Sequence, residues 1–115
     1  MYMMERTGAE NVWEEMHARA MAVMRPREVS RLLKIGSVAA AVESVSGKIY
    51  VGVCVKTECG LGTCAERNAI FNMLTAGENA IRRVIAVNYR GRAMSPCGCC
   101  REFMAQLMPG RFQEI

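Results

Sequence analysis

Apolar and polar residues change their period along the chain, and each change marks a predicted element of secondary structure. Between residues 12 and 24 the apolar positions follow helical spacing and stop before Pro26, which predicts a helix. Residues 38–45 and 48–56 are rich in small and β-branched side chains, and Ser46 and Gly47 between them supply a turn. These two segments therefore predict a β-hairpin.

The second half of the chain predicts two more helices with a strand between them. Residues 64–75 return to helical spacing, whereas residues 84–89 form a short apolar run typical of a buried strand. Ser95 and Pro96 then predict the start of a last helix, because serine caps helices and proline suits the first helical position. We expect a last strand at residues 112–115.

The resulting order is helix, hairpin, helix, strand, helix. Alternation of this kind predicts an α/β protein built as a three-layer α/β/α sandwich. A chain of 115 residues is long enough to bury a core without disulfides or metals, so we expect one domain over residues 1–115. Residues 1–10 have no clear period, and we interpret them as a loose lead-in.

Composition narrows the function classes. The longest apolar run, near residues 38–42, is too short to cross a bilayer, and no signal-peptide core is present, so we expect a cytoplasmic protein without a membrane partner. The net charge of +4 comes from scattered basic residues, which argues against a nucleic-acid partner. Without a secretory signal, the six cysteines favour metal binding, catalysis or plain burial over a disulfide framework.

The stretch TCAERNAI, residues 63–70, holds the first candidate chemistry. Thr63 and Glu66 have the spacing of a capping box, in which each side chain satisfies a backbone N–H at the helix start. Cys64 lies between them at a predicted helix N-terminus, where a thiol's pKa falls. The sequence leaves open whether Glu66 caps the helix or does chemistry.

The stretch SPCGCC, residues 95–100, adds two more thiols. Cys97 and Cys100 are three residues apart and share one helical face, so they could converge with Cys64 on one ion. Three protein ligands on zinc leave a fourth position for water, which is typical of a catalytic site. A structural zinc site, a fourth protein ligand and inert buried thiols stay open as alternatives.

Together with GKIYVG, these two stretches resemble the small tetrameric cytidine deaminases and their blasticidin-S deaminase relatives over residues 35–115. The resemblance implies a cytidine deaminase-like fold with a mixed sheet. It makes Cys64, Cys97 and Cys100 the ligands of one Zn²⁺ per chain, and Glu66 the proton shuttle. The implied enzyme is a hydrolase that converts a small amino-heterocycle to its oxo product and ammonia.

Further roles come with the resemblance. Arg67 would donate hydrogen bonds to the zinc-bound thiolates, and the Ala65 N–H and the Ser95 carbonyl would contact the substrate ring and its amino group. Family members complete each active site with neighbouring subunits, so the resemblance implies a homotetramer or a homodimer. They also continue into another strand and a short C-terminal helix, so we expect a fold without these two elements; the sequence does not say why.

The sequence differs from the family at the positions where family members bind the nucleoside. Alignment on GKIYVG puts Cys54 and Lys56 in the ribose-binding places and Gly36 in the base-stacking place. An ungapped alignment puts Val53 and Val55 in the ribose-binding places instead. We keep Cys54 and Lys56 as candidate substrate-binding residues and leave the substrate open, including one with a carboxylate or a phosphate.

Two other functions stay open. A deaminase-like protein could keep the zinc and the fold but serve only as a binding or assembly module. A thiol redox protein could use Cys97 and Cys100 as its reactive pair.

Overall fold

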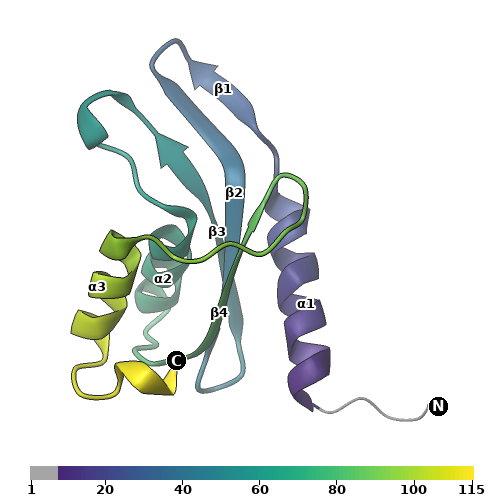
Figure 1. Cartoon of the computed structure of the whole chain (residues 1–115), viewed down its shortest axis with the longest axis vertical. Helices are drawn as coiled ribbons and strands as arrows, with labels where there is room; N and C mark the ends of the chain where they lie inside the picture. Colours follow the sequence, from purple (N-terminus) through teal and green to yellow (C-terminus); the bar gives the residue numbers. More distant parts are fainter. Residues whose placement is uncertain (1–7) are drawn as a thin grey trace, which may run out of the picture.

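The computed structural model describes residues 8–115 (Figure 1). Its elements, in order, are α1 (Gly8–Val23), β1 (Arg27–Ser30), β2 (Leu33–Ser44), β3 (Ile49–Lys56), η1 (Glu58–Gly60), α2 (Ala65–Thr75), β4 (Ile81–Asn88), α3 (Gly98–Leu107) and η2 (Phe112–Glu114). The predicted order of helix, hairpin, helix, strand and helix is confirmed. Of the expected lead-in, residues 1–7 lie outside the described part, and α1 already begins at Gly8.

The four strands form one sheet around the long strand β2. Strand β3 pairs with β2 along one edge, while β1 and β4 pair with different parts of β2. Every pair among the described strands is antiparallel, so the expected mixed sheet is not found in residues 8–115.

The expected last strand is also wrong. Residues 112–115 lie in and just after the 3₁₀ turn η2, where the Glu114 N–H donates to the Arg111 carbonyl at 2.9 Å and the Ile115 N–H donates to the Phe112 carbonyl at 3.1 Å. These short local bonds occupy backbone groups that a strand would use for pairing.

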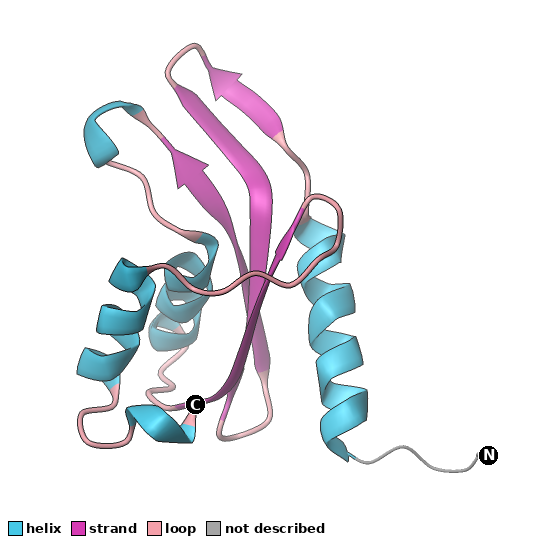
Figure 2. Cartoon of the chain, in the orientation of Figure 1, coloured by secondary structure: helices cyan, strands magenta, loops and turns pink. Residues whose placement is uncertain are grey.

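Helices cover both faces of the sheet, which confirms the three-layer sandwich. Figures 1 and 2 show α1 on one side of the strands, and α2 with α3 on the other. Successive residues of β2 point to opposite faces, and small side chains let both helical layers approach. The core on the α1 side contains Met16, Ala20, Ala39, Ala41 and Val87. The core on the α2 and α3 side includes Ala40, Val42, Ala69, Ile70, Met73, Ile81, Cys100 and Met104.

Between residues 8 and 115, no helix has the length and apolar character needed to cross a membrane.

Candidate metal centre and adjoining pocket

Three cysteines meet where α2 and α3 begin. Cys64 immediately precedes α2, Cys97 immediately precedes α3, and Cys100 is buried in the first turn of α3. Their sulfurs all lie within 4.8 Å of one another, and the Cys64 and Cys97 sulfurs are 3.3 Å apart. Zn–S bonds of about 2.3 Å in a tetrahedral site put sulfurs about 3.8 Å apart. The donor set therefore fits a zinc ion.

Both helix starts differ from the sequence prediction. Cys64, not Thr63, is the N-cap of α2, and the buried Thr63 hydroxyl has no hydrogen-bond partner. Of the two alternatives left open for Glu66, the capping box with Thr63 is therefore not formed. At α3 the N-cap is Cys97 rather than Ser95, because the Cys97 sulfur accepts a hydrogen bond from the Cys100 N–H at 3.4 Å.

Glu66 lies beside the cysteines in the first turn of α2. Its side chain is buried, with the residue 5% exposed, and the Cys100 thiol donates to its Oε1 over 3.8 Å. Burial, followed by the charge of Glu66, raises the pKa of the Cys100 thiol. The backbone N–H of Cys100 lowers the pKa of Cys97. A cation among the three sulfurs would offset the cost of ionising the buried thiol.

Arg67, in the first turn of α2, is a cation in contact with this group. Its Nη2 donates to the Cys64 sulfur over 3.7 Å, and this contact raises the pKa of the Arg67 guanidinium. Its Nε is buried without a partner. The predicted placement of Arg67 against a cysteine sulfur is therefore present in the structure.

A pocket of about 190 Å³ opens onto Glu66, Cys64 and Cys97. The candidate substrate-binding residues predicted from the sequence line the same pocket, although they come from distant segments. They are Cys54 and Lys56 from β3, Ala65 from α2 and Ser95 from the loop before α3. The structure thus brings the whole predicted set together at one place, and the role of each residue stays a prediction.

Cys54 has its own polar neighbour in this pocket. Burial opposes its ionisation, but the Ser37 hydroxyl, 3.3 Å from its sulfur, and the backbone of Val38 and Ser37 outweigh burial. The pKa of Cys54 is consequently below its ordinary value.

Gly36, which alignment put in the base-stacking place, is not in this pocket. It lies in β2 with φ of +84° and lines a different cavity, together with Arg25. A Cβ atom there would come within 2.2 Å of the Arg25 carbonyl oxygen, so the position has no room for a side chain.

Three apolar residues of the pocket were missed by sequence reasoning: Val38, Ala86 and Met94. Val38 and Ala86 look like ordinary strand residues, and only the pairing of β2 with β4 brings them to the site. Met94 is held there because its N–H donates to the Ala86 carbonyl at 2.8 Å. Its position next to Ser95 is the one signal that the sequence offered.

Comparison with known proteins decides the family. Residues 10–113 match the sequence model of the cytidine and deoxycytidylate deaminase zinc-binding region. The chain belongs to this deaminase family. The resemblance noted in the motifs is therefore confirmed, and the cysteine group lies in the region for which the family is described as zinc-binding.

Individual relatives agree with this assignment. A cytidine deaminase from Halalkalibacterium halodurans is 34% identical over 73 residues, which cover 63% of this chain and 55% of that protein. A probable cytidine deaminase from Dictyostelium discoideum is 37% identical over 68 residues, which cover 57% of this chain and 46% of that protein. The chain thus spans about half the length of these curated relatives.

Solved structures confirm the cytidine deaminase-like fold. The crystal structure of cytidine deaminase from Mycobacterium leprae matches with a TM-score of 0.69 and 26% identity, covering 82% of this chain and 78% of that one. Cytidine deaminase from Burkholderia pseudomallei matches with a TM-score of 0.64 and 29% identity, covering 80% of this chain and 73% of that one.

Proposed function

We propose that this chain is a zinc-dependent hydrolytic deaminase that converts a small amino-heterocycle to its oxo product and ammonia. The observation that carries the proposal is a buried carboxylate, Glu66, at one pocket with a three-cysteine group that fits zinc. A structural zinc site has no use for a carboxylate beside it. The relatives named cytidine deaminase support the same reaction class.

Cys64, Cys97 and Cys100 would hold one zinc ion per chain. When bound, the ion supplies a water whose pKa falls from 15.7 to about 7. Three thiolates around a dication leave a net charge of −1, which opposes ionisation of that water. The guanidinium of Arg67, in contact with the Cys64 sulfur, would offset this charge.

Glu66 would move the protons. Its Oε1, which accepts a hydrogen bond from the Cys100 thiol, would take a proton from the attacking water. The same carboxyl would deliver that proton to the ring nitrogen next to the amine-bearing carbon as the water oxygen bonds to that carbon. It would then pass the remaining proton of the new hydroxyl to the amino group, so that the C–N bond breaks, ammonia leaves and the oxo product remains. Because the other buried glutamate of the described residues, Glu43, lies in β2 and does not line this pocket, Glu66 is the candidate for both transfers.

The pocket walls would orient the ring. Ala65 and Ser95 line the same pocket as Glu66, and the Ala65 backbone N–H and the Ser95 carbonyl would hold the ring and its amino group. The apolar side chains of Val38, Ala86 and Met94 would cover the flat faces of the heterocycle and exclude water from it. Cys54 and Lys56 would meet whatever substituent the ring carries.

Metal analysis and ammonia release test the proposal together. We expect one zinc per chain and release of ammonia from at least one member of a panel of cytidine, deoxycytidine, cytosine, blasticidin-like compounds, aminopurines and pterins. A chain with one zinc that turns over none of them would support an idle binding or assembly module. A chain without zinc, with a disulfide between Cys97 and Cys100 in mild oxidant, would support a thiol redox protein.

We also propose assembly into a homotetramer or a homodimer. Several large apolar side chains are exposed on the isolated chain, among them Leu61 at 83% and Phe71 at 40%. Subunit contacts would cover such side chains. Sedimentation at micromolar concentration should give a mass of two or four chains, and a monomer would contradict this expectation.

A further inference from the structure

A second pocket, of about 480 Å³, adjoins the first. Three residues line both pockets, namely Cys54, Lys56 and Cys64, so the two share a wall. The rest of the second pocket comes from the end of β3, the loop after it and α2: Val55, Thr57, Gly60, Gly62, Thr63 and Arg67. A substituent on a ring in the first pocket would reach the second across this wall.

Two backbone hydrogen bonds hold the loop that lines the second pocket against β3. The Val55 N–H donates to the Thr63 carbonyl at 2.9 Å, and the Thr63 N–H donates to the Val55 carbonyl at 3.0 Å. This bridge ties the loop back onto β3 and sets the positions of Thr57 and Thr63 on the pocket lining.

The charged amino acids that line the second pocket are basic. Lys56 and Arg67 line it, and no aspartate or glutamate does. Among residues 8–115, Lys56 has no ion pair. The residue opposite it on the neighbouring strand β2 is another lysine, Lys34. Like charges directly opposite on paired strands repel. Glu66 lines the adjoining pocket and not this one, and Glu58, which follows Thr57 in η1, is outside the lining.

Unsatisfied polar atoms gather at the same place. Three buried side-chain nitrogen or oxygen atoms of the described residues lack a hydrogen-bond partner: Thr57 Oγ1, Thr63 Oγ1 and Arg67 Nε. All three residues line the second pocket. A guanidinium N–H only donates, and a hydroxyl can donate, so all three atoms can be satisfied by acceptors. Buried donors without acceptors are costly, so a group that supplies acceptors would stabilise this lining.

We propose that the substrate carries an anionic group, a phosphate or a carboxylate, which binds in the second pocket between Lys56 and Arg67. This inference rests on the proposed deaminase function, because the amino-heterocycle occupies the first pocket. An anion would offset the charge of Lys56, which has no ion pair among the described residues, and would supply strong acceptors to the unpaired donors of the lining. Lys56 is then the specificity-determining residue, because it lines both pockets.

Turnover of matched substrates tests the inference. Ammonia release would be compared for cytidine, cytidine 5′-phosphate and cytidine 5′-carboxylate, three molecules with the same ring and different charge. We expect kcat/KM to be about ten- to a hundred-fold higher for one or both anions than for cytidine, as charge-assisted hydrogen bonds allow. The two anionic arms separate a phosphate site from a carboxylate site. Equal or higher kcat/KM for neutral cytidine would overturn the inference and leave the deaminase function intact.

Two substitutions of Lys56 test whether this residue causes the preference for an anionic substrate. Lys56→Met should remove most of the preference for the anion, and Lys56→Glu should reverse it. Lys48→Met is the matched control, because it removes the same charge from an exposed site in the turn before β3, outside both pockets. Loss of the preference in the Lys48 variant to the same degree would show only a general charge effect and would overturn the role of Lys56.

A binding measurement keeps the inference testable if no turnover is seen. Calorimetry on the Glu66→Gln variant with the same three molecules measures affinity without reaction. Tighter binding of an anion than of cytidine, weakened by Lys56→Met, would support the anion site even if the deaminase proposal failed. Undetectable or equal binding of all three molecules would overturn it.

Discussion

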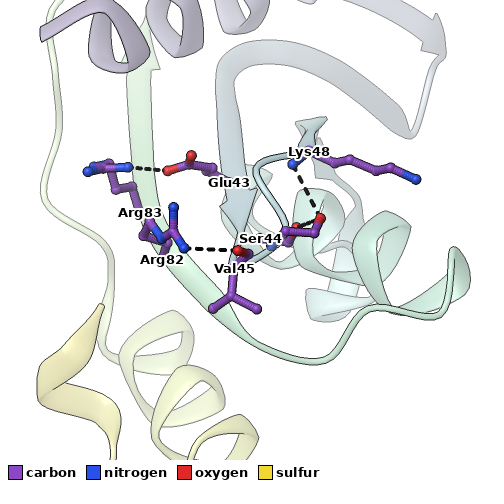
Figure 3. A network of polar contacts seen from close by, with 7 residues as sticks. Glu43, Ser44, Val45, Lys48, Arg82 and Arg83 are labelled. Atoms are coloured by element: carbon purple, nitrogen blue, oxygen red, sulfur yellow. Dashed lines mark hydrogen bonds and ion pairs between the residues drawn. The ribbon is translucent and has the colours of Figure 1, made fainter. Parts of the chain in front are cut away.

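Two buried glutamates lie in different surroundings. Glu43 is 4% exposed and forms an ion pair with Arg83 across the β2 and β4 pairing, in a polar network at one end of the sheet (Figure 3). Glu66 is 5% exposed, and no ion pair joins it to another described residue; it accepts a hydrogen bond from the Cys100 thiol. A buried carboxylate with a counter-charge serves structure, whereas one kept without a counter-charge beside a metal-binding group is suited to chemistry.

Removing a cysteine should have the largest effect. Cys100→Ser replaces a buried thiol of the candidate metal group with a poor zinc ligand. We expect zinc content and ammonia release both to fall close to zero, because the proposed reaction needs the ion. Elemental analysis of the purified variant checks the metal. Cys99→Ser is the control, since Cys99 is exposed and outside the group. Full zinc content in the Cys100 variant would remove this residue from the ligand set.

Glu66→Gln should have the next largest effect, on rate alone. The amide keeps the shape of the side chain but cannot shuttle protons, so we expect kcat to fall about 10²- to 10⁴-fold with zinc still bound. The melting temperature should stay the same or rise, because the change removes an unpaired buried charge. Steady-state ammonia assays and thermal melts measure both quantities. A variant with a large loss of stability would indicate a structural carboxylate instead.

Breaking the ion pair between Glu43 and Arg83 should lower the stability of the fold and leave the reaction rate unchanged. Arg83→Met leaves the Glu43 carboxylate buried without a counter-charge, and we expect unfolding to become easier by about 1–3 kcal/mol, less than for a fully buried pair because the Arg83 side chain is 24% exposed. Ammonia release per zinc should not change. Denaturant unfolding measures the loss. The double variant Glu43→Gln with Arg83→Met should lose less stability than Arg83→Met alone, and an equal loss would contradict the ion-pair account.

A third glutamate, Glu78, is partly buried and is stabilised by hydrogen bonds. We expect a change in its surroundings to have the smallest effect on the protein. Hydrogen bonds from Ser46, Tyr50 and Ser44 lower its pKa to about 2, and the Tyr50 hydroxyl donates to its Oε2 at 2.7 Å. Because this pKa lies below the ordinary value of about 4.3, ionised Glu78 stabilises the fold above that value and the contribution is lost as pH falls towards 2.

Tyr50→Phe removes one of these donors. We expect the pKa of Glu78 to rise towards its ordinary value and the acid-dependent part of stability to shrink. Carboxyl titration by NMR measures the pKa directly, and Tyr89→Phe is the control, because Tyr89 contacts Arg90 rather than Glu78. An unchanged pKa in the Tyr50 variant would show that the serines alone hold this carboxylate.

Local sequence patterns were enough to predict most elements and the cysteine group. Helical spacing in α1 and α2 reflects the face that each buries, and helix N-termini place Cys64 and Cys97 at adjacent ends. The four-residue strand β1 was missed, because all of its residues are exposed and no apolar alternation marks it. Both helix starts were placed too early, because the true caps are cysteines, whereas serine and threonine are the usual ones.

The features that could not be predicted from the sequence depend on contacts between distant segments. Val38 and Ala86 reach the first pocket only through the pairing of β2 with β4, and the second pocket exists because residues 57–63 fold back onto β3. The sheet was expected to be mixed, but residues 112–115 close a local turn instead of pairing. Gly36 was aligned with a substrate contact, yet the carbonyl of Arg25 fills the space where its side chain would be.

The central claim is that, of the two buried glutamates, Glu66 alone takes part in the reaction. Its most direct test is the rate of ammonia release per bound zinc in Glu66→Gln and Glu43→Gln, prepared and assayed side by side with the unmodified chain. The account predicts a loss of at least about 100-fold for the Glu66 variant and a rate within about two-fold of the unmodified chain for the Glu43 variant. Equal rates in the two variants at equal zinc content would contradict it.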